Sequence, residues 1–287
     1  MFFNKVKEPM DMTHGPMWKN ILLLAIPLAL TTLVQQFFHS VDMAVVGRFC
    51  GYFELAAVGS NGSIISLLVN LFIGFSAGSN VVIAQLIGGK RMKTARKAVH
   101  VSLYIALLSG LLVMILGIIL SPFMLKLISS PPEVIGLATI YLRIYFIGIP
   151  PLMIYNFASA ILRSRGETTK PFFCLTMGGA INVVLNLLFV IVFKWSVAGV
   201  AIATSLSNLV SCILILRILM KDKGPLRVTL KEFKFDKYIF SRIFKMGLPM
   251  SIQSCLFPMA NMVVQSAINS LGTTVMAGCA AASSIEA

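Results

Sequence analysis

The chain has 287 residues, of which only 12% are charged, about half the share usual in soluble domains. Hydrophobic residues make up 57% and the mean hydropathy is +0.90, so a water-soluble globule would lack the polar side chains to cover its surface. The Lys and Arg residues behind the net charge of +14 lie between long apolar runs and do not line a polar face. Composition therefore excludes an ordinary soluble enzyme and a nucleic-acid-binding protein.

Seven segments are long and apolar enough to cross about 30 Å of hydrocarbon as helices of roughly 20 residues. They lie at about 21–47, 57–88, 98–121, 134–160, 171–193, 197–219 and 244–271. An eighth begins near residue 275, and we expect it to be cut off by the end of the chain. Residues 1–20 are polar and lack a cleavage pattern, which predicts a cytoplasmic lead-in instead of a signal peptide. The predicted fold class is an all-α, polytopic helical membrane bundle.

Orientation follows from the cations, because Lys and Arg accumulate in cytoplasmic loops. Of the 24 Lys and Arg residues, 20 fall in the lead-in and in the second, fourth and sixth loops or at their edges. The opposite loops hold three, and Arg143 lies within a span. The N-terminus is therefore predicted to be cytoplasmic, in a multi-pass protein of the plasma (cytoplasmic) membrane.

A weak internal repeat appears at an offset of 222 residues, as in transporters built from duplicated halves. It pairs Ile21 with Ile243, Pro27 with Pro249 and Val41 with Val263. Six helices separate the two starts, which predicts parallel repeats. We therefore expect a six-helix first lobe at 21–220, a basic cytoplasmic linker at 221–243, and at 244–287 the first helix and start of the second helix of an incomplete second lobe.

Asp42 is the most unusual residue within a span, since a carboxylate there costs about 2.5–3.5 kcal/mol on insertion scales and marks a functional site by default. Gln35, His39 and Asp42 stand at i, i+4 and i+7, on one helix face that must turn inward. Arg48 is six residues away, too far along the helix for a local ion pair. The competing interpretation is an Asp that reaches outer water from the helix end.

Asn182 and Asn186 share one face of the fifth span, and Thr204 lies in the sixth. Counted along the helices, these three residues and Asp42 lie at similar depth. One carboxylate, two amides and a hydroxyl favour a proton site or an all-oxygen cation site that holds Na⁺. The two amides are also able to hydrogen-bond neighbouring helices to one another, and the sequence supports this packing role as well as it supports ion binding.

Other chemistry finds little support in the sequence. The five cysteines form no paired spacing, and the three histidines lie far apart, so neither predicts a metal site, a disulfide framework or a catalytic cluster. No phosphate loop is present, and Gly74, Gly78, Gly88–Gly89 and Gly178–Gly179 predict close helix approach instead. We expect no enzymatic activity and no cofactor.

Three stretches carry a resemblance to the multidrug and toxic compound extrusion (MATE) family. They are IPLALTTLVQQFFHSVDMAVVGRFCGYFELAAVG, YLRIYFIGIPPLMIYNFASAILRSRGETTKP, and the pair INVVLNLLFV and VAGVAIATSLSN. Their order and spacing are similar to that family's first lobe, from about residue 15 onward.

The resemblance implies a twelve-helix transporter of two lobes that exports small organic cations in exchange for H⁺ or Na⁺ by alternating access. It also implies that Asp42, Gln35, Asn182 and Thr204 match coupling positions. Asn186 stands where the family often has Asp, which leaves the coupling ion open. We expect His39, Tyr141 and Tyr145 to line the cavity, and the full-length protein to be monomeric in membrane lipid.

Two alternatives stay open. A flippase for a lipid-linked anionic precursor belongs to the same wider group but would need a cationic cavity, whereas the intramembrane charges here are Asp42 and Arg143. The other alternative is a non-functional fragment of a transporter.

Overall fold

The computed structural model describes residues 17–222, 224, 226–229 and 235–286, and within these ranges the chain is helical without strands. Most of the predicted lead-in and residues 230–234 of the predicted linker lie outside the described residues. The elements are α1 (Met17–Phe49), α2 (Tyr52–Gly88), α3 (Met92–Leu127), α4 (Pro132–Ile147), α5 (Ile149–Arg163), α6 (Thr169–Leu187), the π-helical turn η2 (Leu188–Val192), α7 (Ser196–Lys221), α8 (Lys237–Ser270) and α9 (Thr273–Glu286).

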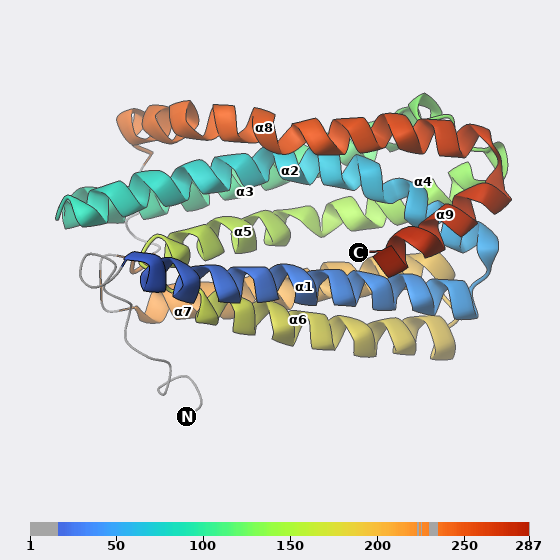
Figure 1. Cartoon of the computed structure of the whole chain (residues 1–287), viewed down its shortest axis with the longest axis horizontal. Helices are drawn as coiled ribbons and strands as arrows, with labels where there is room; N and C mark the ends of the chain where they lie inside the picture. Colours follow the sequence, from blue (N-terminus) through green and yellow to red (C-terminus); the bar gives the residue numbers. More distant parts are fainter. Residues whose placement is uncertain (1–16, 223, 225, 230–234, 287) are drawn as a thin grey trace.

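The helices run side by side along the long axis of an elongated bundle (Figure 1). Among the described residues, five helices are long and apolar enough to cross a membrane, and the bent pair α4–α5 makes a sixth. These six correspond to the first six predicted spans, which confirms the all-α polytopic fold class. The seventh predicted span forms the 34-residue helix α8, which carries more polar residues and falls below the same apolar threshold.

The fourth span differs from the continuous helix predicted at 134–160. It breaks at Gly148, where α4 and α5 meet at a bend of 48°. Pro150 and Pro151 cause the break, because neither has an N–H group to bond the carbonyl four residues back. The hydroxyl of Ser205 on α7 donates to the Ile144 carbonyl at 3.2 Å, so a neighbouring helix satisfies one acceptor near the bend.

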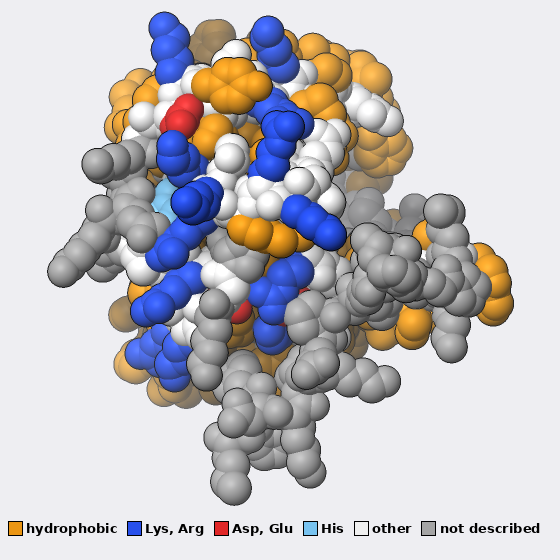
Figure 2. Space-filling view, turned by 90° about the vertical axis from the view of Figure 1, so that its left-hand side faces the viewer, with side chains coloured by type: hydrophobic (Ala, Val, Ile, Leu, Met, Phe, Trp, Pro, Cys, Tyr) orange, Lys and Arg blue, Asp and Glu red, His pale blue; other side chains and the backbone are white. Residues whose placement is uncertain are grey.

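The sides of the bundle are apolar. Ile119 on α3 is 66% exposed and Val184 on α6 is 64% exposed, and many other large apolar side chains on these helices are likewise uncovered. Water would disfavour such a surface, whereas lipid tails accommodate it. By contrast, Lys and Arg side chains gather at the end of the bundle where the α2–α3, α5–α6 and α7–α8 connections meet (Figure 2). We call this the basic end.

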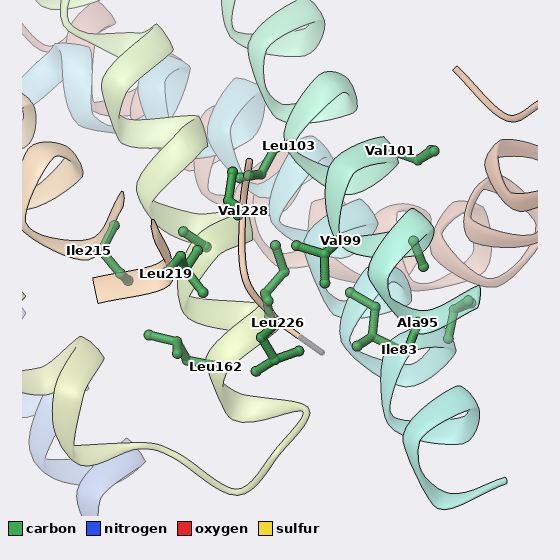
Figure 3. Close-up of a cluster of buried hydrophobic side chains, with 14 of the residues drawn as sticks. Ile83, Ala95, Val99, Val101, Leu103, Leu162, Ile215, Leu219, Leu226 and Val228 are labelled. Carbon is green, nitrogen blue, oxygen red and sulfur yellow. The ribbon is translucent and has the colours of Figure 1, made fainter. Parts of the chain in front are cut away.

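The described part of the α7–α8 linker packs into the core at the basic end. Leu226 and Val228 point among side chains of α3, α5 and α7, including Leu162 and Leu219 (Figure 3). The Nε2 atom of His100 on α3 accepts a hydrogen bond from the backbone N–H of Thr229 at 3.1 Å. The linker is therefore docked at these residues.

An ion cluster fastens the linker to the α5–α6 loop. Arg165 contacts Glu167 and Asp222, each at 3.0 Å, and Lys170 pairs with the second oxygen of Glu167. Two bases thus face two acids, and their formal charges cancel. We refer to Arg165, Glu167, Lys170 and Asp222 as the ion cluster.

Candidate functional site

A cavity of about 340 Å³ opens beside the middle of the bundle and is lined by α1, α2, α4, α5, α6 and α7. Gln35, His39 and Asp42 of α1 all line it, so the shared helix face predicted for them turns inward. Gly179 on α6 allows α1 to approach closely, because a Cβ atom there would collide with the ring of Phe38. This close approach brings Asp42 next to α6.

The carboxylate of Asp42 meets the two amides of α6. Asn186 is fully buried, and its Nδ2 donates a hydrogen bond to Asp42 Oδ1. Asn182 and Asn186, one turn apart, both face the carboxylate, as their common face requires. A buried carboxylate is costly unless polar partners replace its lost hydration, and the two amides supply them.

The amide of Asn182 suits either protonation state of Asp42. One of its terminal atoms lies 2.7 Å from Asp42 Oδ1. With the nitrogen there, the amide donates to an ionised Asp42, and its oxygen accepts from the backbone N–H of Thr204 at 3.3 Å. With the oxygen there, it accepts from a protonated Asp42, and its nitrogen donates to Thr204 Oγ1 at 3.3 Å.

These contacts join Asp42, Asn182, Asn186 and Thr204 into one group, which we call the carboxylate–amide cluster. Gln35 and His39 line the same cavity, but no described residue forms a hydrogen bond with either side chain. Tyr141 and Tyr145 of α4 also line it, with stacked rings whose centroids are 6.0 Å apart. Every residue predicted for the site except the fully buried Asn186 therefore faces this cavity directly.

The cluster carries one acid without a basic partner. No Lys or Arg lines the cavity, and Asp42 makes no ion pair within the described part of the chain. No group of three His, Cys, Asp or Glu side chains could hold a metal in the residues that the structure describes. A small cation in the cavity would instead meet Asp42 and the Thr204 hydroxyl, while Asn186 Oδ1, a buried oxygen without a hydrogen-bond donor in the described chain, lies behind the lining.

Further polar residues of the cavity were not predicted from the sequence. Asn208 and Ser211 on α7 extend the line begun by Thr204, at i+4 and i+7, and Asn156 projects from α5. The spacing on α7 is the same signal that identifies the face of α1, so it could have revealed them. They add amide and hydroxyl groups between the cluster and the basic end.

The sequence profile of the MatE family matches residues 27–188, more than half of the chain. The chain belongs to the MatE family. The prediction made from the three sequence stretches is thereby confirmed, and the chain is a multi-pass integral membrane protein.

Named relatives agree with this membership. The chain is 30% identical over 267 residues to the probable multidrug resistance protein YoeA of Bacillus subtilis, covering 91% of this chain and 58% of that protein. It is 21% identical over 250 residues to the multidrug export protein MepA of Staphylococcus aureus, covering 87% and 55%. The MatE chain thus spans a little over half the length of these relatives, and their names support the expectation that it is not an enzyme.

Solved MATE transporters share the fold. An inward-facing structure of a MATE family transporter of the MOP superfamily has a TM-score of 0.79 and 26% identity, covering 92% of this chain and 60% of that one. An outward-facing structure gives the same TM-score and identity, covering 87% and 55%. The MatE chain resembles both states equally by this measure.

Proposed function

We propose that the chain is the first-lobe part of a secondary active antiporter that exports small organic cations in exchange for H⁺ or Na⁺ by alternating access. One observation carries the proposal: Asp42, an acid without a basic partner in the described chain, faces a cavity and is held there by two amides. The names of the relatives support multidrug export as the direction of transport.

Exchange requires that the two cargoes compete for one charge. An ionised Asp42 attracts an organic cation, and a proton or Na⁺ on the carboxylate removes that attraction. The Asn182 amide hydrogen-bonds in both orientations, so neither form of Asp42 lacks a partner. Coupling then follows if the two conformations of the transporter bind the proton or Na⁺ with different affinity.

The cavity fits the proposed substrates. Its volume of about 340 Å³ is at the lower end of small-molecule sites, and the Tyr141–Tyr145 pair offers aromatic faces near the carboxylate. The absence of Lys and Arg from its described lining disfavours an anionic lipid precursor, the cargo of the alternative flippase function. Charge at the cavity therefore supports the cation exporter over the flippase.

We also propose that the basic end faces the cytoplasm in the plasma membrane. The Lys and Arg side chains that gather there support this orientation (Figure 2). It places the N-terminus on the cytoplasmic side. In a variant whose five native cysteines are replaced, labelling of cysteines introduced at Lys93 and Glu133, at opposite ends of the bundle, by an impermeant maleimide would test it, since only the residue 133 variant should react from outside.

The deciding experiment is ethidium efflux by the full-length protein in cells. Asp42→Asn keeps the shape of the side chain but removes its charge, so coupled efflux should fall at least about 100-fold with expression unchanged. Glu133→Gln, which removes an exposed acid at the start of α4, is the matched control and should transport normally. Equal efflux by Asp42→Asn and wild type would refute the proposed role of Asp42.

A further inference from the structure

The two halves of α8 pack against the rest of the chain in different ways. Near the basic end the backbones of α2 and α8 touch, since a Cβ atom added to Gly78 of α2 would lie 2.5 Å from the Cα atom of Gly247 on α8. Gly74 meets Ser251 one turn further on, where an added Cβ atom would collide with the Ser251 backbone. Small residues four apart on both helices thus form a close crossing in this half.

The same half is also anchored in the core. Ile239 and Ile243 are buried with residues of α2, α3, α5 and α7. Arg242 donates to the Gln85 side chain at 2.8 Å, and Asp236 caps the start of α8 by accepting from the N–H of Tyr238 at 3.1 Å. This half of α8 is fixed to the bundle by both packing and polar contacts.

The other half of α8 packs loosely. A crevice of about 600 Å³ separates it from α2 and the end of α3. Leu67, Leu127 and Ile128 line one wall of the crevice, and Met259, Val263 and Ser266 line the other. Apolar contacts therefore hold this half less firmly than the half near the basic end.

One buried side chain bridges the helices beside this crevice. Asn269 is 1% exposed, and its Nδ2 donates to the Ile128 carbonyl at 2.7 Å and lies 3.5 Å from Ser130 Oγ. Gln265 donates to the Asn269 Oδ1 at 2.8 Å and holds the amide in this orientation. Between residues 256 and 270, Asn269 is the residue whose side chain hydrogen-bonds to another described element.

The acceptor explains why the bond is specific. Ile128 follows the last residue of α3, and carbonyls at a helix end lack a donor within their own helix. If α8 swings away, both the Ile128 carbonyl and the Asn269 amide must find water. The crevice beside them supplies a route for that water.

We propose that Asn269 is a latch: it holds the far half of α8 against the α3–α4 loop, while the Gly78–Gly247 contact acts as the pivot. Breaking the latch opens the crevice at the end of the bundle opposite the basic end. The role of this opening in transport rests on the proposed alternating access, but the opening itself does not. Asn269 is accordingly a positioning residue that contacts neither the cavity nor its cargo.

Hydrogen exchange of the full-length protein in lipid nanodiscs tests the latch without reference to transport. Asn269→Leu keeps the volume and removes the hydrogen bond, so amides of 256–270 should exchange about tenfold faster, the change expected for one lost buried hydrogen bond. Amides of 237–251, at the pivot, should change less than about twofold. Asn261→Leu on the same helix, whose side chain bonds to no other described element, is the matched control.

Two results would overturn the latch. Exchange in Asn269→Leu that matches wild type would show that the bond does not hold the far half. Exchange that rises equally along all of α8 would show loss of packing instead of motion about a pivot. Neither result depends on whether the protein transports.

A second variant keeps the idea testable if Asn269→Leu does not fold. Ser130→Cys combined with Asn269→Cys should be joined by a short, reducible bis-methanethiosulfonate cross-linker, because Asn269 Nδ2 and Ser130 Oγ of the native side chains lie 3.5 Å apart. Efflux should be lost on cross-linking and restored by a reductant, whereas each single variant should show no such response. A complete cross-link with undiminished efflux would overturn the latch, while Asp42→Asn separately tests the transport function.

Discussion

The carboxylate–amide cluster and the ion cluster surround their buried and partly buried acids with opposite kinds of partner. In the ion cluster, Glu167 and Asp222 face two bases, and the charges cancel. In the carboxylate–amide cluster, the described side chains that hydrogen-bond Asp42 are amides, so its charge is solvated but not neutralised. A cancelled charge serves to join segments of the chain, whereas an uncancelled charge beside a cavity is available to a mobile cation.

The largest expected difference concerns stability. Glu167→Gln leaves Lys170 without its acid in a site where Glu167 is 8% exposed, so the free energy of unfolding should fall by about 2 kcal/mol. Asp42→Asn removes a charge that has no basic partner in the described chain and leaves an amide that can still accept a hydrogen bond, so its stability should equal or exceed that of wild type. Thermal unfolding in detergent, followed by circular dichroism, measures both. A similar loss in both variants would break the distinction between the two clusters.

A second acid should strengthen the binding of Na⁺ by the carboxylate–amide cluster. Asn186→Asp adds a carboxylate directly beside Asp42, so Na⁺ affinity should rise about tenfold through the added attraction. Asn208→Asp is the matched control, because Asn208 lines the same cavity and its side chain forms no hydrogen bond with the described residues of the cluster. Binding of radioactive Na⁺ measures the change. If both variants gain equally, general cavity charge sets the affinity and the cluster does not.

The smallest expected effect on Na⁺ affinity comes from removing the Thr204 hydroxyl. Thr204→Val preserves the shape of the side chain and removes one oxygen, so Na⁺ affinity should fall about two- to threefold. Thr204→Ser should recover most of the loss because it restores the hydroxyl. The same Na⁺ binding assay distinguishes them. A Thr204→Ser variant as weak as Thr204→Val would show that the methyl group, through packing, is what matters.

The sequence predicts well what depends on one helix alone. The first six spans follow from apolar length, and the inward face of α1 follows from the spacing of Gln35, His39 and Asp42. Asn182 and Asn186 share a face for the same reason. Their placement beside Asp42 depends on how α1 packs on α6, for which the sequence offered only a depth count.

Contacts between elements were harder to predict. Asn269 donates a hydrogen bond to a backbone carbonyl, and every residue of the chain carries such a carbonyl. No sequence pattern therefore identifies Ile128 as its partner. Glycines show the same limit: Gly78 meets another helix as predicted, but the prediction was wrong for Gly88, where an added Cβ atom meets nothing within 4 Å. A small residue permits close approach, but its partner must be supplied by the fold.

The bend at Gly148 bears on how the chain enters the membrane. Its two arms, α4 and α5, have 16 and 15 residues, and each is shorter than the roughly 20 residues that a crossing requires. Ser205, which bonds a carbonyl near the bend, belongs to a helix that the ribosome makes later. The contact that Ser205 makes near the bend can therefore form only after the sixth crossing has been synthesised.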